Sequence, residues 1–154
     1  MQHMEDAGSV ERAGELAVAM QHGCLGIRVG RLHRLVARRF EQALRPLGLS
    51  ISQLEVLSAL VVNGAPVKPT DLAGWLAIER STMSRNLALM ESRGLVETTE
   101  TSPTGRSQKI AVTPAGISAL ADAETAWRQA QAAVEAAIGP HAVGTLDQWL
   151  ARLV

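Results

Sequence analysis

Side chains that can donate hydrogen bonds are concentrated in the stretch RSTMSR. Arg80 and Arg85 flank it, and Ser81, Thr82 and Ser84 lie between them. A guanidinium can donate two hydrogen bonds to N7 and O6 of guanine, and small hydroxyl groups can bind base edges or phosphates. A helix that enters the major groove with its N-terminus first needs such side chains in its leading turns. These residues therefore predict a DNA-reading helix.

The residues before this stretch predict the rest of a helix-turn-helix. Ser50 and Gln53 fit a capping box that opens a helix, which Gly64 would end. Pro69 suits the first position of a second, short helix. The predicted buried stripe of that short helix is Leu72, Trp75 and Leu76.

The DNA-reading helix itself is predicted from its spacing. Met83, Leu87 and Met90 fall on one face, opposite the polar residues, and Gly94 suits the left-handed position after the helix. The segments LVETT and KIAVT, joined by ETSPTGRSQ, predict a β-hairpin. This hairpin would form a wing, with Arg106 at its tip reaching the minor groove or the DNA backbone.

Long apolar stripes lie on both sides of this region. Residues 24–47 predict one amphipathic helix, and Pro114 opens an alanine-rich helix that runs to Gly139 and Pro140. A last helix carries apolar residues in 3-4-3 spacing, at Val143, Leu146, Leu150 and Leu153. Because a small central domain does not need so much apolar surface, the stripes predict burial against a second copy of the chain.

Composition sets the broad class. Hydrophobic residues make up 47 % of the 154, with one Phe and no Tyr, which favours a single, mainly helical domain with an aliphatic core. The formal net charge is zero, so bulk charge alone would not hold nucleic acid. No apolar run approaches the roughly 18 residues of a membrane span, so we expect a cytoplasmic protein with no membrane partner.

Catalytic and metal-binding patterns are not found. The sequence has no nucleophile elbow, phosphate loop or paired catalytic carboxylates, which predicts a protein that is not an enzyme and has no cofactor. The spacing of His22, Cys24, His33 and His141 does not resemble a closed zinc ligand set, so no metal is expected.

Longer segments resemble the multiple-antibiotic-resistance regulator (MarR) family of bacterial transcription factors. The resemblance is carried by EQALRPLGLSISQLEVLSAL, DLAGWLAIERSTMSRNLALMESRGLVE and GRSQKIAVTPAG, and it extends over residues 24–153. It implies a winged helix-turn-helix, mainly α with a small β-hairpin wing, that forms a homodimer on double-stranded DNA. Residues 1–23 would be an N-terminal arm or short helix, 24–47 and 114–154 dimerisation helices, and 50–113 the DNA-binding lobe of a single unit, 24–154.

The resemblance also implies roles for residues. Arg80, Ser81, Thr82, Ser84 and Arg85 would contact DNA, and Arg106 would be the wing arginine. To these we add Lys68 as a phosphate contact. The family commonly has Asp two residues before the wing arginine, where this chain has Thr104. Family members usually repress genes and release DNA on binding a small, often phenolic, effector or on oxidation.

Two alternatives stay open at the level of sequence. Cys24, expected in the first turn of the long helix with Arg28 one turn on, is either a redox sensor or a buried, inert thiol. The whole chain is either a DNA-binding regulator or a helical dimer that binds a small ligand or a protein without sequence-specific DNA binding. The three tryptophans, Trp75, Trp127 and Trp149, are expected to fill the core.

Overall fold

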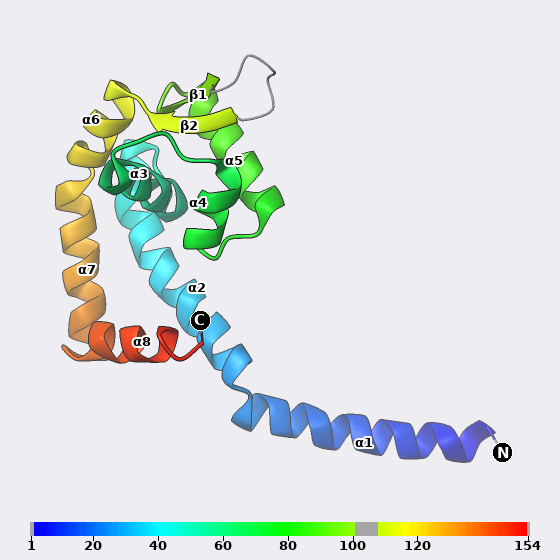
Figure 1. The fold of residues 1–154 in the computed structure, drawn as a ribbon. Coiled ribbons are helices and arrows are strands. Elements are labelled where there is room, and N and C mark those ends of the chain that lie inside the picture. Colours follow the sequence, from blue (N-terminus) through cyan, green and yellow to red (C-terminus); the bar gives the residue numbers. More distant parts are fainter. Residues whose placement is uncertain (1, 101–107, 154) are drawn as a thin grey trace. The chain divides into compact units, whose positions relative to one another are not determined.

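The computed structural model describes residues 2–100 and 108–153 (Figure 1). Its elements, in order, are α1 (Gln2–Gly23), α2 (Leu25–Leu44), the 3-10 turn η1 (Arg45–Leu47), α3 (Ile51–Asn63), α4 (Pro69–Trp75), α5 (Arg80–Ser92), β1 (Val96–Glu100), β2 (Gln108–Val112), α6 (Pro114–Asp122), α7 (Glu124–Ile138) and α8 (Ala142–Leu150). This confirms the predicted fold class, a mainly helical chain with one β-hairpin. The chain forms two compact units, Met1–Arg38 and Arg39–Val154, while the predicted division into dimerisation and DNA-binding parts stays a prediction.

The first unit contains a longer N-terminal helix than the sequence suggested. The expectation of an arm or short helix was wrong, because α1 has 22 residues. Cys24 lies between α1 and α2 rather than in a first turn: its N–H donates to the Met20 carbonyl at 3.1 Å, and its carbonyl accepts from the Arg28 N–H at 3.3 Å. The thiol residue is half-buried, not buried. The Arg28 guanidinium donates to the carbonyl of His22.

In the second unit, the predicted start and end of α3 are confirmed. The Ser50 side chain accepts a hydrogen bond from the Gln53 N–H at 3.1 Å, and the Gln53 side chain accepts one from the Ser50 N–H at 3.2 Å. Gly64 ends the helix in the left-handed conformation, with φ +68°. A residue with a Cβ would be strained there.

The prediction for the short helix α4 is correct in position and wrong in burial. Pro69 is its first residue, as expected. Leu72 is fully buried and Ala73 nearly so, but Leu76 is only half-buried and Trp75 is 57 % exposed. Trp75 therefore does not fill the core.

The core of the second unit gathers around α3. This helix packs against α5, α6 and β2, and α4 packs against α5 and β2. The hairpin strands are antiparallel, with Val96 opposite Val112. Val67, just before α4, adds a bridge to the hairpin through two hydrogen bonds with Ile110, of 2.9 and 2.8 Å. The hairpin is thus fixed to the start of α4 as well as to the end of α5.

The junction from the hairpin to α6 is tightly packed. The Thr113 hydroxyl accepts a hydrogen bond from the Gly116 N–H at 3.0 Å and lies 2.6 Å from the carbonyl oxygen of Gly94. The alanine-rich segment after Pro114 was predicted as one helix, and this was wrong: it is divided into α6 and α7 at Ala123.

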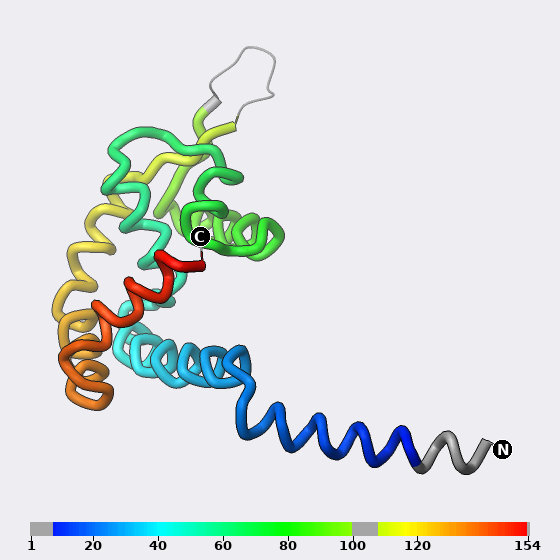
Figure 2. The backbone as a smooth tube through the Cα atoms, turned by 60° about the horizontal axis from the view of Figure 1, so that its bottom comes forward, coloured from blue at the N-terminus to red at the C-terminus, as the bar shows by residue number. Residues whose placement is uncertain are grey.

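Helices α7 and α8 keep much of their apolar surface exposed. In Figure 2 the chain runs from α6 through α7 and then turns into α8. Trp127 is 37 % exposed and Trp149 is 49 % exposed. The expectation that they fill the core is therefore wrong for the single chain. The stripe on the last helical segment is also exposed, at Val143, Leu146, Leu150 and Leu153. Among the described residues, no single helix has both the length and the apolarity needed to cross a membrane.

Candidate nucleic-acid interface

The predicted DNA-reading helix is α5, and it has the predicted two faces. Met83, Leu87 and Met90 are buried, at 1, 5 and 0 % exposure. The polar residues Arg80, Ser81, Thr82, Ser84 and Arg85 are all exposed. Arg93 forms the C-cap, and Gly94 follows with φ +69°, the left-handed conformation predicted for it.

Glu79 caps the leading end of α5. One of its carboxylate oxygens accepts hydrogen bonds from the backbone N–H of Ser81 at 2.7 Å and of Thr82 at 3.1 Å, and also from the Ser81 hydroxyl. The Ser81 hydroxyl, followed by the Thr82 N–H, lowers the pKa of Glu79 from its ordinary value of 4.5. The carboxylate is therefore ionised at neutral pH.

This cap changes what the leading end can offer to a phosphate. The N–H groups at a helix start bind anions when they are unpaired. Here the N–H groups of Ser81 and Thr82 already bind Glu79. Contacts to DNA at this end must therefore come from side chains rather than from these two amides.

Arg85 lies against the turn that precedes it. Its Nε donates to the carbonyl oxygen of Ser81 and its Nη2 to the Ser81 hydroxyl oxygen, both at 3.1 Å. A continuous chain of hydrogen bonds thus joins Glu79, Ser81 and Arg85 on the exposed surface. To reach a base, the Arg85 guanidinium must exchange its bonds with Ser81 for bonds with DNA.

The other predicted contacts are distributed around this turn. Lys68 is exposed and is the N-cap residue of α4, with no side-chain cap hydrogen bond. It follows Val67, whose bridge to β2 holds the start of α4 beside the hairpin. Arg106 and Thr104 lie outside the described residues, so the wing contact stays a prediction.

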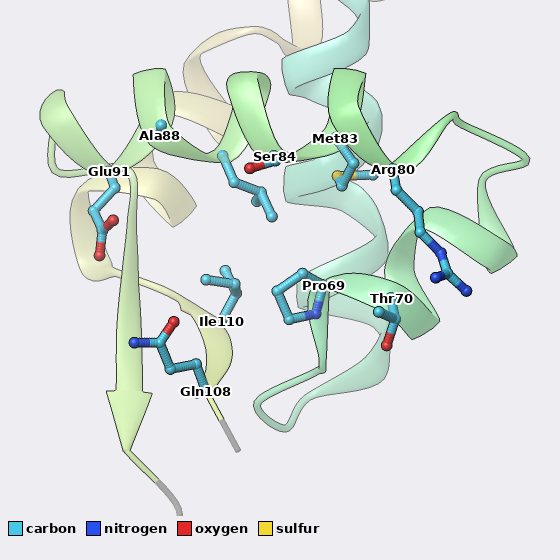
Figure 3. A pocket seen from close by; sticks show the side chains of 10 residues that line it. Pro69, Thr70, Arg80, Met83, Ser84, Ala88, Glu91, Gln108 and Ile110 are labelled. Carbon is cyan, nitrogen blue, oxygen red and sulfur yellow. The ribbon is translucent and has the colours of Figure 1, made fainter. Parts of the chain in front are cut away.

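A pocket of about 290 Å³ opens between α5, the start of α4 and β2. Figure 3 shows Met83 and Ser84 from α5, Pro69 from α4 and Ile110 from β2 around it. Arg80 is also among the lining residues. Two predicted DNA contacts, Arg80 and Ser84, are therefore brought together with the wing strand.

The structure adds site residues that the sequence did not reveal. Thr70 and Gln108 line the same pocket, from α4 and β2. Glu79 was not singled out from the sequence, because glutamate is not among the preferred N-cap residues. Its place two residues before Ser81 and three before Thr82 was the available signal.

Comparison with known proteins agrees with this geometry. A family model described as the MarR family matches residues 47–107. The M. tuberculosis transcriptional regulator MosR, solved in complex with DNA, is 29 % identical; the match covers 84 % of this chain and 98 % of that one, with a TM-score of 0.69. Residues 47–107 match the MarR family, and the chain shares its fold with DNA-binding transcriptional regulators.

Two further MarR-family structures are similar. The transcriptional repressor CouR, solved on a 23-mer DNA duplex, is 26 % identical over 87 % of this chain and 94 % of that one, with a TM-score of 0.72. MarR from E. coli shares the fold at 19 % identity, over 84 % of this chain and 96 % of that one, with a TM-score of 0.66. A search of curated protein sequences finds no match.

Proposed function

We propose that this protein is a MarR-family repressor that binds a pseudo-palindromic operator as a homodimer, in the cytoplasm of a bacterial cell. One α5 helix would enter the major groove at each half-site, with half-sites about one helical turn (~10 bp) apart. Arg85 would read guanine, the hydroxyls of Ser81, Thr82 and Ser84 would bind bases or phosphates, and Arg80 and Lys68 would contact the backbone.

The observation that carries the proposal is the amphipathic character of α5. Met83, Leu87 and Met90 are buried in the lobe, and the first turns expose two guanidinium groups and three hydroxyls together. A helix that served only to stabilise the lobe would not need this set. MosR and CouR, which are both similar to this chain and both solved with DNA, support the same use of the fold.

Titration of the purified protein against duplexes from the promoter region beside its own gene tests the proposal. Fluorescence anisotropy at two salt concentrations separates specific from non-specific binding. Non-specific binding comes almost entirely from electrostatic contacts with phosphates, which added salt weakens. We expect one duplex to bind at least about a thousand times more tightly than a scrambled one. Equal affinity for both would favour the alternative, a helical dimer that binds a ligand or protein without reading DNA.

Arg85→Ala is the sharpest variant for this site. We expect it to cost about 1–3 kcal/mol of operator binding and to relax specificity at one base position. Arg128→Ala is the control, because Arg128 lies on α7 and pairs with Glu124 at 2.8 Å. Normal operator binding by the Arg85 variant would refute the role of that side chain.

The dimer proposal draws on the exposed stripes of α7 and α8. Leu146, Trp149 and Leu150 expose 38, 49 and 60 % of their surfaces. Exposed apolar surface of this extent marks an interaction site. A second copy of the chain, contributing the same stripe, would cover it in a symmetric interface.

The effector would be a small aromatic or phenolic molecule. CouR from Rhodococcus jostii RHA1 has also been solved with p-coumaroyl-CoA. In this chain the pocket beside α5 approaches the lower size limit of small-molecule sites. A ligand there would cover Arg80 and Ser84, so it would compete with operator DNA. If operator affinity is unchanged at saturating salicylate, small phenolic molecules do not compete with DNA at this pocket. Release by an oxidant acting at Cys24 stays a prediction.

A further inference from the structure

The C-terminal end of α5 is held by a side chain from outside the DNA-reading turns. Arg93 donates from Nη1 to the carbonyl oxygen of Gly48 at 2.7 Å and to Oε1 of Gln53 at 3.3 Å. These acceptors are 45 and 40 residues away in sequence. They belong to the segment that leads from η1 into α3, so Arg93 connects the end of the recognition helix to the start of α3.

Both acceptors are fixed in place. Gln53 is only 4 % exposed, and its side chain also closes the capping box with Ser50. Gly48 is left-handed, with φ +67°, and a Cβ built there would lie 3.4 Å from Nη2 of Arg93. The guanidinium therefore meets a rigid surface rather than a mobile loop.

A second polar contact joins the same two helices. Nδ2 of Asn86 donates to the Ser52 hydroxyl at 3.0 Å. Asn86 and Arg93 are seven residues apart, which places their contacts about 10 Å from each other along α5. One contact would let the helix pivot, whereas two fix its direction relative to α3.

The apolar face of α5 does not fix that direction as strictly. Burial of Met83, Leu87 and Met90 is non-directional, so a small rotation or slide would keep most of the buried area. Hydrogen bonds weaken steeply when their distance or angle changes. The polar contacts are thus the part of the packing that is sensitive to orientation.

The start of α3 also receives a side chain from the end of α2. Oε1 of Glu41 accepts a hydrogen bond from the backbone N–H of Ile51 at 2.9 Å. Residues 48–53 therefore bind Glu41 from one helix and Arg93 from another.

We infer that Arg93, together with the Asn86–Ser52 pair, is a positioning residue for DNA recognition. It sets the angle at which α5 presents residues 80–85 and so contributes to the choice of sequence without touching a base. The inference rests on the proposed function and deepens it. Since small misplacement of a base-reading side chain loses its hydrogen bonds, loss of Arg93 reduces operator affinity more than affinity for unrelated DNA.

The test compares Arg93→Ala with Arg45→Ala. Arg45 lies in η1, at the same junction, and is exposed, so its removal changes the net charge equally while leaving the Arg93 contacts intact. Affinities for operator and scrambled duplexes are measured by anisotropy over a range of salt, and thermal unfolding of each variant is recorded. We expect Arg93→Ala to lower the operator-to-scrambled ratio roughly tenfold relative to Arg45→Ala, with equal salt dependence on the scrambled duplex.

Ser52→Ala gives a second readout from the α3 side, because it removes the Asn86 contact without altering α5. It should lower the same ratio in the same direction, and Arg93→Lys should recover part of the loss by keeping one donor. A wild-type ratio in both Arg93→Ala and Ser52→Ala would overturn the inference. So would equal weakening on both duplexes with the salt slope reduced by about 1, since that is the signature of a phosphate contact. If the unsubstituted chain prefers neither duplex, the proposed function fails, and the inference fails with it.

Discussion

Gly116 occupies a position in α6 where the structure leaves no room for a side chain. A Cβ there would lie 2.1 Å from the carbonyl oxygen of Leu95, 2.9 Å from Cγ2 of Val112 and 3.1 Å from Cδ2 of Leu57. Ordinary contact begins at 3.4 Å, so the first of these overlaps is more than an ångström. Gly116→Ala therefore forces α6 away from the end of α5 and the hairpin.

The cost follows from what must move. The obstructing atom is a backbone oxygen that accepts hydrogen bonds from the Thr113 N–H at 3.2 Å and from the Thr113 hydroxyl at 3.1 Å. Overpacking alone costs about 1–3 kcal/mol, and weakening a hydrogen bond adds up to about 1 kcal/mol. We expect Gly116→Ala to lower the free energy of unfolding by ~3 kcal/mol.

Thermal unfolding by circular dichroism measures this effect. For a chain of this length ~3 kcal/mol corresponds to a fall in Tm of roughly 10 °C. Gly74→Ala is the matched control, because Gly74 lies in α4 with no atom within 4 Å of a built Cβ. It should be neutral or slightly stabilising. All samples are compared at one protein concentration, since dimerisation would shift Tm. A Gly116→Ala chain that melts within about 1 °C of wild type would refute the packing argument.

Three other predictions concern charge and association. Lys68→Ala should weaken binding to all duplexes alike and reduce the slope of log affinity against log salt by about 1, and an unchanged slope would exclude a phosphate contact. Because the pKa of Glu79 is lowered in the folded chain, its carboxylate stabilises the fold above pH 4.5, and this contribution is lost as the pH falls through the lowered value. Glu79→Gln should therefore show a smaller loss of unfolding free energy between about pH 5 and pH 3, and identical pH profiles would contradict the cap. Leu150→Glu places a charge on the exposed stripe of α8 and should shift the mass measured by light scattering towards the monomer; a monomeric wild type at micromolar concentration would exclude the dimer.

Predictions succeeded where the cause is local. The capping box of Ser50 and Gln53, Pro69 at a first helical position, and Gly94 after α5 each depend on chemistry within a few residues. The two faces of α5 follow from periodicity alone, since Met83 and Met90 are two turns apart. Such features can be predicted from the sequence without knowing how distant parts of the chain pack.

Predictions failed where burial depends on distant parts of the chain. Leu72 and Trp75 are both apolar and one turn apart on α4, but Leu72 is fully buried and Trp75 is 57 % exposed. Which of them faces α5 and β2 depends on how those elements pack, and periodicity does not contain that information. The division at Ala123 was missed for a similar reason, because the segment carries no proline or glycine there.

The chemistry at the start of α5 was only half predictable. RSTMSR indicated which groups could bind DNA, but not that Glu79 would occupy the N–H groups of the first turn or that Arg85 would bind Ser81. These contacts bear on specificity. When Arg85 leaves Ser81 for N7 and O6 of guanine, it exchanges two hydrogen bonds for two. The number of hydrogen bonds that Arg85 makes therefore does not rise on binding the correct base. At a base that lacks this pair of acceptors, Arg85 keeps its bonds to Ser81 and contributes nothing to binding. The Glu79–Ser81–Arg85 chain therefore favours discrimination over affinity, and it places the expected cost of Arg85→Ala towards the lower end of about 1–3 kcal/mol.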